Sequence, residues 1–128
     1  MPTVPWKSFA SPESERQYLV LASELPLRRF SATLRFGRRA TQVRRQLASA
    51  AGLIGYSLMA KPFARRYWTL SVWNDEEALQ GFVSQSPHVE VMSTLVPDMG
   101  PTRFVRWSVS GSQLPPSWPE AFEHLEQV

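Results

Sequence analysis

The sequence contains no cysteine, only two histidines and no long uninterrupted apolar segment. Without a thiol, the protein has no catalytic cysteine, iron–sulfur cluster or cysteine-based zinc site. His88 and His124 leave little for a metal centre, because neither belongs to a His-x-x-x-His or Glu-x-x-His pair. No window approaches the length of an apolar transmembrane helix, and the residues after Met1 do not resemble a signal peptide. We therefore expect no membrane span and a cytoplasmic location.

Lysine is scarce, and the net charge is only +3. Lys7 and Lys61 are the only lysines, so arginine supplies most of the positive charge, much of it between Arg28 and Arg45. A basic stripe attracts phosphate, which allows a nucleic-acid interface. A solvated helix face is the simpler interpretation at so small a net charge, and we expect no nucleic-acid partner.

Several catalytic motifs are also missing. The sequence has no glycine-rich phosphate loop and no Ser, His and Asp set around a recognisable nucleophile turn. Glu90 and Asp98 stand apart and do not form a paired acid–base dyad. These absences favour neither a nucleotide-binding enzyme of that kind nor a serine hydrolase.

The 128 residues, 43% of them apolar, fit one domain that folds without a disulfide or a metal. Residues 1–16 carry three prolines and are predicted to form an N-terminal arm or loop, which Trp6 could pin down. Residues 17–110 are predicted to form the core, and residues 111–128 a C-terminal extension. The predicted elements are a strand Gln17–Glu24, a helix Ser31–Ala51, strands Leu53–Lys61 and Arg65–Trp73, a helix that Asn74 caps and Pro87 interrupts, a strand Thr102–Ser110, and a last helix Glu120–Glu126.

This order predicts an α+β fold of the ferredoxin-like βαββαβ type, with an antiparallel sheet and an extra C-terminal helix. The strand Arg65–Trp73 carries bulky side chains on both faces, so both faces of the sheet need cover. The two core helices cover one face, and a second copy is the simplest cover for the other, which gives a homodimer and a dimeric α+β barrel. Trp68 and Trp73 lie five residues apart and must face opposite sides. We expect Trp68, Leu70 and Val72 to face the helices.

The first helix is predicted from one apolar stripe with steps of four and three residues. The stripe consists of Phe36, Ala40, Val43, Leu47 and Ala50. Gly52 follows the last turn, where a glycine commonly ends a helix.

The segment Tyr67–Met92 reads YWTLSVWNDEEALQGFVSQSPHVEVM. A strand that ends in tryptophan, an acidic helix start, Ala-Leu, an aromatic residue and a histidine resemble the dimeric α+β barrel superfamily. Within it, the segment resembles the antibiotic biosynthesis monooxygenases and related small bacterial proteins without assigned function. The turn Gly52–Tyr56 and the strand Arg103–Val109 also fit, so the resemblance covers residues 17–110. It implies oxidation of aromatic polyketides with O₂ and no cofactor, haem binding and degradation through a helix histidine, or lyase, isomerase or cyclase chemistry.

His88 is the candidate catalytic residue, because an imidazole titrates near neutral pH and could act as a general base or bind a haem iron. Its alternative role is to cap or hydrogen-bond the helix near Pro87. Trp73 corresponds to the strand-end tryptophan of the resemblance. The candidate substrate-binding residues are aromatic or apolar side chains and one arginine: Tyr56, Trp68, Trp73, Met92, Trp107 and Arg28. Core packing for the aromatic residues, and a solvated loop for Arg28, are the alternatives.

Three functions follow from these residues. The first is a cofactor-independent monooxygenase-like enzyme that acts on an aromatic or polyketide-type substrate between sheet and helices, with His88 as base. The second is a haem-binding protein with His88 as axial ligand. The third is a non-catalytic dimeric module that binds a ligand or a partner, in which His88 matters only for stability.

Overall fold

The computed structural model describes residues 3–28, 33–84 and 99–128. In chain order, the helices and strands are β1 (Thr3–Ser8), β2 (Gln17–Pro26), α1 (Thr33–Leu47), β3 (Leu53–Lys61), β4 (Arg66–Trp73), α2 (Glu76–Val83), β5 (Arg103–Ser110) and α4 (Trp118–Glu126). A short 3₁₀ turn, Pro62–Ala64, joins β3 to β4 in a hairpin, and another, Gly111–Gln113, follows β5. Among the described residues, no helix is long and apolar enough to cross a membrane.

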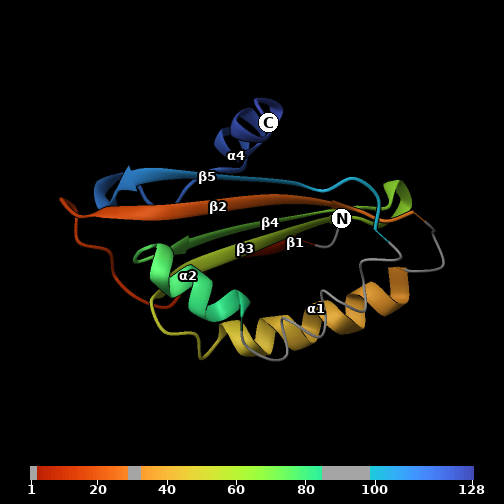
Figure 1. Ribbon diagram of the computed structural model, residues 1–128, viewed down its shortest axis with the longest axis horizontal. Coiled ribbons are helices and arrows are strands. Elements are labelled where there is room, and N and C mark those ends of the chain that lie inside the picture. The colour runs from red at the N-terminus through yellow and green to blue at the C-terminus, as the bar shows by residue number, and fades with distance from the viewer. Residues whose placement is uncertain (1–2, 29–32, 85–98) are drawn as a thin grey trace.

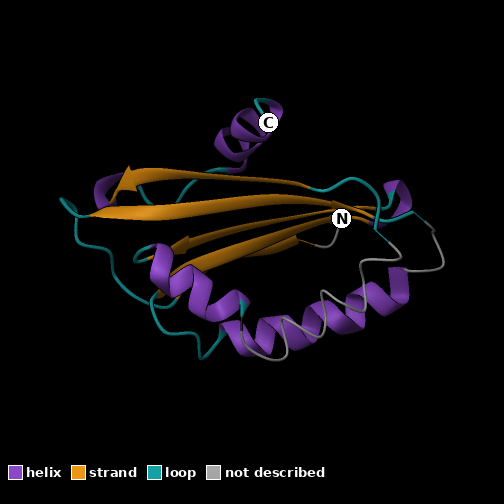
Figure 2. Cartoon of the chain, in the orientation of Figure 1, coloured by secondary structure: helices purple, strands orange, loops and turns teal. Residues whose placement is uncertain are grey.

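One antiparallel sheet of five strands, in the order β1-β3-β4-β2-β5, forms the centre of the molecule. Helices α1 and α2 cover one face, and α4 lies on the other (Figures 1 and 2). Strand β4 is central, with β3 on one side and β2 on the other, and β1 and β5 are the two edge strands. This arrangement confirms the α+β, ferredoxin-like fold.

Strand β1 corrects the prediction that residues 1–16 form an arm or loop. It pairs with β3 at the sheet edge, where Lys7 lies opposite Tyr56. Pro5 suggested a loop, but an edge strand has a free side and tolerates proline, and the register shifts between Val4 and Lys7 accommodate it. Trp6 holds the strand down as expected: a Cβ added at Gly55 would come within 2.4 Å of the Trp6 ring.

Helix α1 is held against the sheet by the predicted apolar stripe. Leu47 lies in a buried cluster with Tyr56 and Trp73, and Val43 and Ala50 pack against that cluster. The Phe36 side chain and residues 31–32 lie outside the described residues. The helix ends at Leu47, earlier than predicted, and the chain then turns at Gly52, whose φ of +80° confirms that position as glycine-specific.

The side chains of β4 alternate between the two faces, which confirms that Trp68 and Trp73 face opposite sides. The prediction that Trp68, Leu70 and Val72 face the core helices is wrong. These three residues lie in the cluster under α4, together with Ala121 of that helix. Both faces of β4 are apolar, so the pattern of the strand alone does not say which face each helix covers.

Helix α4 covers the face that the sequence assigned to a second copy. Ala121 and Leu125 of α4 pack into the cluster that buries Val20 and Leu70. The helix is capped by Ser117, whose Oγ accepts a hydrogen bond from the Glu120 N–H, 3.2 Å away. The chain therefore buries much of this face itself. The homodimer remains a prediction.

Helix α2 begins one residue later than predicted. Asp75, not Asn74, is its N-cap, and its Oδ1 accepts a hydrogen bond from the Ala78 N–H at 2.8 Å. Arg106 of β5 forms an ion pair with Glu76 in the first turn. A hydrogen bond from Gln80 and a second one from Arg106 lower the pKa of Glu76 below its ordinary value.

Candidate functional site

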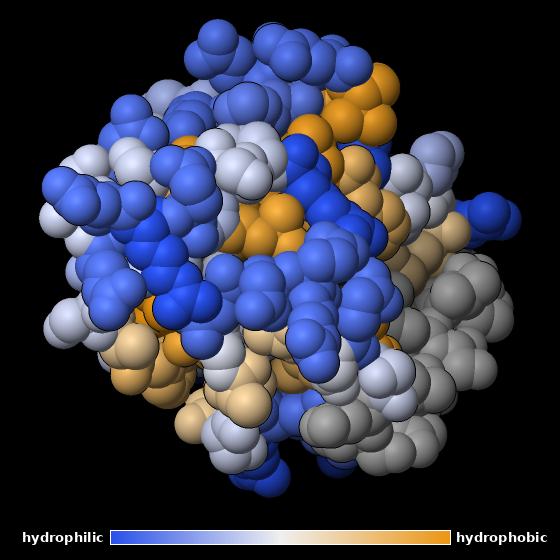
Figure 3. Space-filling view, turned by 60° about the vertical axis from the view of Figure 1, so that its left-hand side comes forward, coloured by the Kyte–Doolittle hydropathy of each residue, from blue (hydrophilic) through white to orange (hydrophobic). Residues whose placement is uncertain are grey.

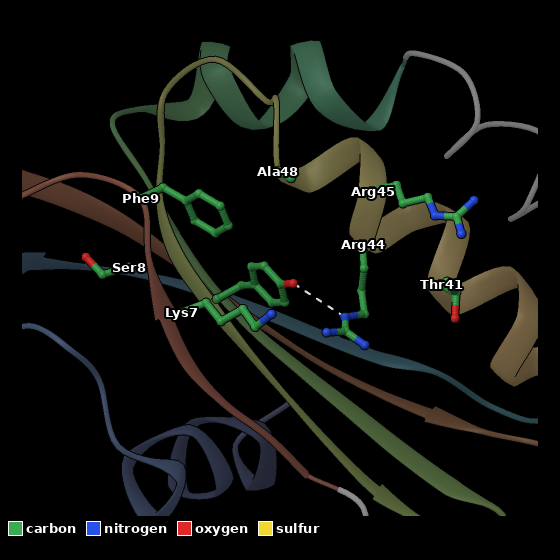
Figure 4. A pocket seen from close by; sticks show the side chains of 8 residues that line it. Lys7, Ser8, Phe9, Thr41, Arg44, Arg45 and Ala48 are labelled. Atoms are coloured by element: carbon green, nitrogen blue, oxygen red, sulfur yellow. Dashed lines mark hydrogen bonds between the residues drawn. The ribbon is translucent and has the colours of Figure 1, made fainter.

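An open pocket of about 600 Å³ lies between α1, the end of β1 and β3, on the face of the sheet that α1 covers (Figure 4). A cavity of this volume is of the size that holds a small organic ligand. We call it the Tyr56 pocket. Its lining consists of Lys7, Ser8, Phe9, Thr41, Arg44, Arg45, Ala48 and Tyr56.

Helix geometry explains why α1 and the residue that follows it contribute four of these residues. Thr41, Arg44, Arg45 and Ala48 stand at positions i, i+3, i+4 and i+7, which share one face of a helix. That face lies beside the apolar stripe, so these side chains border the pocket and stay out of the core. On the sheet side, the register places Lys7 of β1 directly opposite Tyr56 of β3.

Two aromatic rings form the apolar wall of the pocket. Tyr56 is 3% exposed and fixed in the core, whereas Phe9 is 42% exposed. The rings stack with centroids 5.8 Å apart and an interplanar angle of 13°. The Phe9 N–H donates to the Ile54 carbonyl at 2.8 Å, which fixes the backbone of the chain after β1. The pocket thus offers a flat aromatic surface beside solvent.

The pocket is positively charged. Among the described residues, its lining includes Lys7, Arg44 and Arg45 and no acidic side chain. Arg44 extends toward the sheet, where its Nε donates to the Tyr56 hydroxyl at 3.4 Å, whereas Arg45 extends away from the sheet (Figure 4). In the described parts of the chain, no carboxylate forms an ion pair with any of the three cations. An anionic ligand would therefore meet positive charge that no described acid neutralises.

Of the predicted site residues that the structure describes, Tyr56 alone lines this pocket. Trp73 shares its core cluster, but it is 1% exposed, and its Nε1 donates to the buried Ser71 Oγ at 2.9 Å. Trp73 therefore packs the core beneath α1 and α2, which was the alternative interpretation of this residue. His88 and Met92 lie outside the described residues, and their roles stay predictions.

Trp68 and Trp107 lie on the opposite face of the sheet, so the structure does not bring them together with Tyr56. In the sheet register, Trp68 stands opposite Glu24, and Trp107 opposite Val20, on the face that α4 covers. Trp107 stacks on His124 of α4 with ring centroids 3.9 Å apart. The strand alternation therefore divides the predicted aromatic residues between the two faces of the sheet.

Arg28 also lies apart from the pocket. Its Nε donates to the Met99 carbonyl at 2.6 Å, and its own carbonyl accepts a hydrogen bond from Arg65 at 2.8 Å. These contacts tie the end of β2 to the β3–β4 turn and to the start of the last described segment. In the structure, Arg28 has a structural role that its sequence position did not indicate.

Sequence reasoning missed Lys7, Phe9, Arg44 and Arg45. The spacing of Arg44 and Arg45 beside the stripe was visible, but it was interpreted as a solvated helix face. Lys7 and Phe9 were placed in a loop, so no argument directed them toward Tyr56. Predicting a strand over residues 3–8, paired with Leu53–Lys61, would have placed Lys7 near Tyr56.

The described residues of the pocket provide no imidazole for a haem iron, and His124 stacks on Trp107 on the other face of the sheet. The described residues also contain no group of three metal-ligating side chains. A haem site would thus depend on His88.

Hydrophobic side chains reach the surface at separate places. On the side of the molecule near α2, they form small patches among hydrophilic residues (Figure 3). Among the residues that the structure describes, the large exposed apolar ones are Phe9, Phe63, Phe104 and Val128, which belong to four different parts of the chain. Phe9 is the one of the four that also lines the Tyr56 pocket.

The fold and the site define a ferredoxin-like α+β domain with an open pocket between sheet and helix. The family described as antibiotic biosynthesis monooxygenase matches residues 32–94 of this chain. The match includes α1, β3, β4 and α2, and it therefore contains Arg44, Arg45 and Tyr56, whereas Lys7 and Phe9 precede it.

Several solved structures have a similar fold. SnoaB from Streptomyces nogalater, described as a cofactor-independent oxygenase, is 13% identical, with a TM-score of 0.62 over 81% of this chain and 99% of its own. A proposed antibiotic biosynthesis monooxygenase from Nitrosomonas europaea is 12% identical, with a TM-score of 0.63 over 70% and 95% of the two chains. A conserved protein from Methanosarcina mazei is 13% identical, with a TM-score of 0.64 over 70% and 90%. At these identities, the likeness shows the fold.

No curated protein matches the sequence significantly. The family match and the shared fold both point to the dimeric α+β barrel superfamily and to the antibiotic biosynthesis monooxygenases as the proteins that this chain resembles. This confirms the resemblance that the segment Tyr67–Met92 indicated.

Proposed function

We propose that the protein is a cofactor-independent monooxygenase that acts on an aromatic or polyketide-type substrate bound in the Tyr56 pocket. The family match supports monooxygenase-like chemistry. The observation that carries the substrate class is the stacked pair of Phe9 and Tyr56 beside an open volume of about 600 Å³. A flat apolar ring fits such a wall.

The proposed chemistry begins with removal of a proton from the substrate, for which His88 is the candidate base. The resulting electron-rich anion reacts with O₂ directly. Where a ring CH₂ becomes a carbonyl, the balance is R₂CH₂ + O₂ → R₂C=O + H₂O, and the substrate supplies all four electrons. No flavin or metal is then required.

The test is oxygen consumption by the purified protein with hydroxylated polycyclic aromatic compounds, such as hydroxyanthrones, and no added cofactor. We expect O₂ uptake equal to the product formed, and a loss of about a hundredfold or more in His88→Ala, the size typical of a missing general base. His124→Ala is the matched control, because this histidine lies on the α4 face, and it should retain the rate. Turnover that is equal in His88→Ala and the wild type would refute the role of His88.

A haemin titration separates the proposal from the haem alternative. The wild type is titrated beside His88→Ala, and the Soret band is followed by absorbance. We expect no saturable shift that depends on His88. A saturable shift that His88→Ala abolishes would instead make His88 an axial ligand. If His88→Ala changes only stability, and no substrate is turned over, a non-catalytic binding module is the remaining reading.

We also propose a homodimer and a cytoplasmic location, with no nucleic-acid or membrane partner. The superfamily supports the dimer, although α4 covers much of the face that a second copy was expected to bury. Such a dimer must form through other surfaces or displace α4. Sedimentation of the purified protein tests whether it is a dimer, and cell fractionation tests the cytoplasmic location. Retention on immobilised DNA or on lipid vesicles would contradict the proposal that the protein has no nucleic-acid or membrane partner.

A further inference from the structure

We infer that the Tyr56 pocket selects aromatic ligands that carry an anionic oxygen at the edge of the ring, with Arg44 and Lys7 as the anchors. The inference rests on the proposed function, because it assigns a substrate class to the same pocket. The chemistry it names is an aromatic anion, whether a carboxylate or an ionised phenol or enol.

The first support is the pairing of cations with the aromatic wall. Lys7 stands opposite Tyr56 in the strand register, and Arg44 reaches the hydroxyl of the same tyrosine from α1. A ring lying against Phe9 and Tyr56 therefore has a cation from each side of the pocket near its edge (Figure 4). The same group of residues would therefore bind both the aromatic ring and the negative charge of a ligand.

The second support is the electrostatic state of Arg44. This side chain is half-buried, and its one hydrogen bond in the described structure, to Tyr56, is long at 3.4 Å. A guanidinium carries five N–H donors, so most of them are available to a ligand. A carboxylate or phenolate oxygen would make shorter, charge-assisted hydrogen bonds than the phenol does.

The third support is the contrast with three arginines of the sheet. Arg66 and Arg103 both pair with Glu24, at 3.4 and 3.3 Å, and Arg106 pairs with Glu76. Each of these three arginines has a carboxylate partner within the chain, with Glu24 shared by Arg66 and Arg103. Lys7 and Arg44 form no ion pair with a described carboxylate, and both line a cavity.

Part of this recognition belongs to residues outside the family match. Lys7 and Phe9 come from β1 and the residue that follows it, before residue 32, where the match begins. The strand β1 thus contributes one cation and one ring wall to a pocket whose other side is α1. We assign the selection for an aromatic anion to this combination.

The test is isothermal titration calorimetry with three small probes and no turnover. The probes are 2-naphthoate, its neutral analogue 2-naphthamide, and cyclohexanecarboxylate, which has the charge without the aromatic ring. We expect 2-naphthoate to bind about tenfold or more tightly than either other probe, as for a hydrogen bond to a charged group.

The variant Arg44→Met removes the charge and keeps much of the side-chain length. It should weaken 2-naphthoate binding about tenfold and leave 2-naphthamide binding within about twofold. Arg38→Met is the matched control, since Arg38 is an exposed residue of the same helix outside the pocket. Phe9→Ala should weaken both naphthalene probes and leave the weak binding of cyclohexanecarboxylate unchanged. Thermal melting of each variant verifies that it is folded.

4-Nitrophenol distinguishes the two sources of the anion. If an ionised phenol is accepted, the absorbance of the phenolate form rises on binding to the wild type and not on binding to Arg44→Met. A response to 2-naphthoate alone restricts the class to carboxylates.

Equal binding of 2-naphthoate and 2-naphthamide, no effect of Arg44→Met, or no binding of any probe would overturn the inference. Binding of cyclohexanecarboxylate as tight as 2-naphthoate would overturn the aromatic part of it. The proposed function can fail independently of this inference, and the two failures give different results. If the probes bind as expected and no aromatic compound consumes O₂, the anion site stands without the monooxygenase. If neutral aromatic compounds are oxidised as fast as anionic ones, the monooxygenase stands without the selection.

Discussion

Two buried side chains show how single residues stabilise the core beside the pocket. Trp73 and Ser71 lie on the face of β4 that α1 and α2 cover, and the indole N–H donates to the Ser71 hydroxyl. Both residues are buried, so water cannot replace this acceptor if it is removed.

Replacing Ser71 by alanine should lower the free energy of unfolding by about 1–3 kcal/mol, because the buried Trp73 N–H loses its acceptor. Urea denaturation followed by tryptophan fluorescence measures the change. Ser49→Ala is the control: its hydroxyl is exposed, and its loss should change stability by about 0.5 kcal/mol at most. If the two variants lose equal stability, the Trp73–Ser71 hydrogen bond contributes nothing.

Tyr56 has both a structural and a proposed binding role at the residue scale. Its ring belongs to the core, and its hydroxyl meets Arg44 at the edge of the pocket. The sequence predicted Tyr56 as a ligand contact because of its ring and its position after Gly52–Gly55. It did not predict the cation, because nothing local links residues 44 and 56.

At the scale of elements, the turn from α1 into β3 depends on one backbone conformation. Gly52 has a positive φ, and a Cβ added there would come within 2.6 Å of the Ala78 Cβ of α2. The turn therefore excludes a side chain for two independent reasons, backbone strain and contact with the next helix.

Gly52→Ala should destabilise the protein by about 2 kcal/mol, since a non-glycine residue in the left-handed region costs about 1–3 kcal/mol before any clash. The midpoint of urea unfolding measures this. Gly37→Ala in α1 is the opposite control, because nothing lies within 4 Å of an added Cβ and φ is not positive there. It should stabilise the protein by about 0.5–1 kcal/mol. Equal effects of the two substitutions would contradict this account of the turn.

Helix α2 and strand β5 are linked by a pH-dependent contact. The pKa of Glu76 lies below its ordinary value because Gln80 and Arg106 hydrogen-bond its carboxylate. A carboxyl group whose pKa is lower in the folded than in the unfolded state stabilises the fold above its unfolded pKa. This stabilisation is lost as pH falls through the folded pKa.

We therefore expect the melting temperature of the wild type to fall more steeply than that of Glu76→Gln between about pH 6 and about pH 2. The difference should be small, because Glu76 is exposed and salt screens the contact. Differential scanning fluorimetry at low ionic strength measures both curves, with Glu77→Gln as the control from the same helical turn. Parallel curves for the wild type and Glu76→Gln would show that Glu76 does not stabilise the fold.

At the scale of the whole molecule, α4 determines how the second sheet face is covered. Trp118 of α4 donates to Ser57 Oγ at 3.2 Å, and Leu125 is buried at the other end of the helix. Between them, the helix crosses a face that contains Trp68 and Val20. An apolar face of this kind associates with other surfaces when it is uncovered.

Removing residues 117–128 should therefore increase self-association and the binding of a hydrophobic dye. Sedimentation velocity at several concentrations measures the association. A matched point variant, Leu125→Ala, should lower stability by about 2–5 kcal/mol without removing the helix. If the truncated chain sediments like the full chain and binds no more dye, α4 does not protect this face.

Much of the fold was predictable because its signals are local. The strands were visible in runs of aromatic and β-branched residues, α1 in its apolar stripe, and the turn in Gly52. The boundaries of Leu53–Lys61 match the prediction, and those of the other described core strands differ by one or two residues. Strand β1 was missed because prolines masked a pairing that only the neighbouring strand β3 provides.

The candidate site was predictable only in part, since a site depends on which faces meet. The sequence by itself determined the order of the elements from residue 17 onward and the opposite directions of Trp68 and Trp73, and it indicated the resemblance to the superfamily. It could not decide which face of the sheet each helix covers, because both faces of β4 are equally apolar. The tertiary structure decided that the aromatic residues divide between two clusters and that α4 buries one face. It also brought Lys7, Arg44 and Tyr56 together. These residues are far apart in the sequence, and only strand pairing and helix packing place them side by side, so no local sequence pattern predicts the contact.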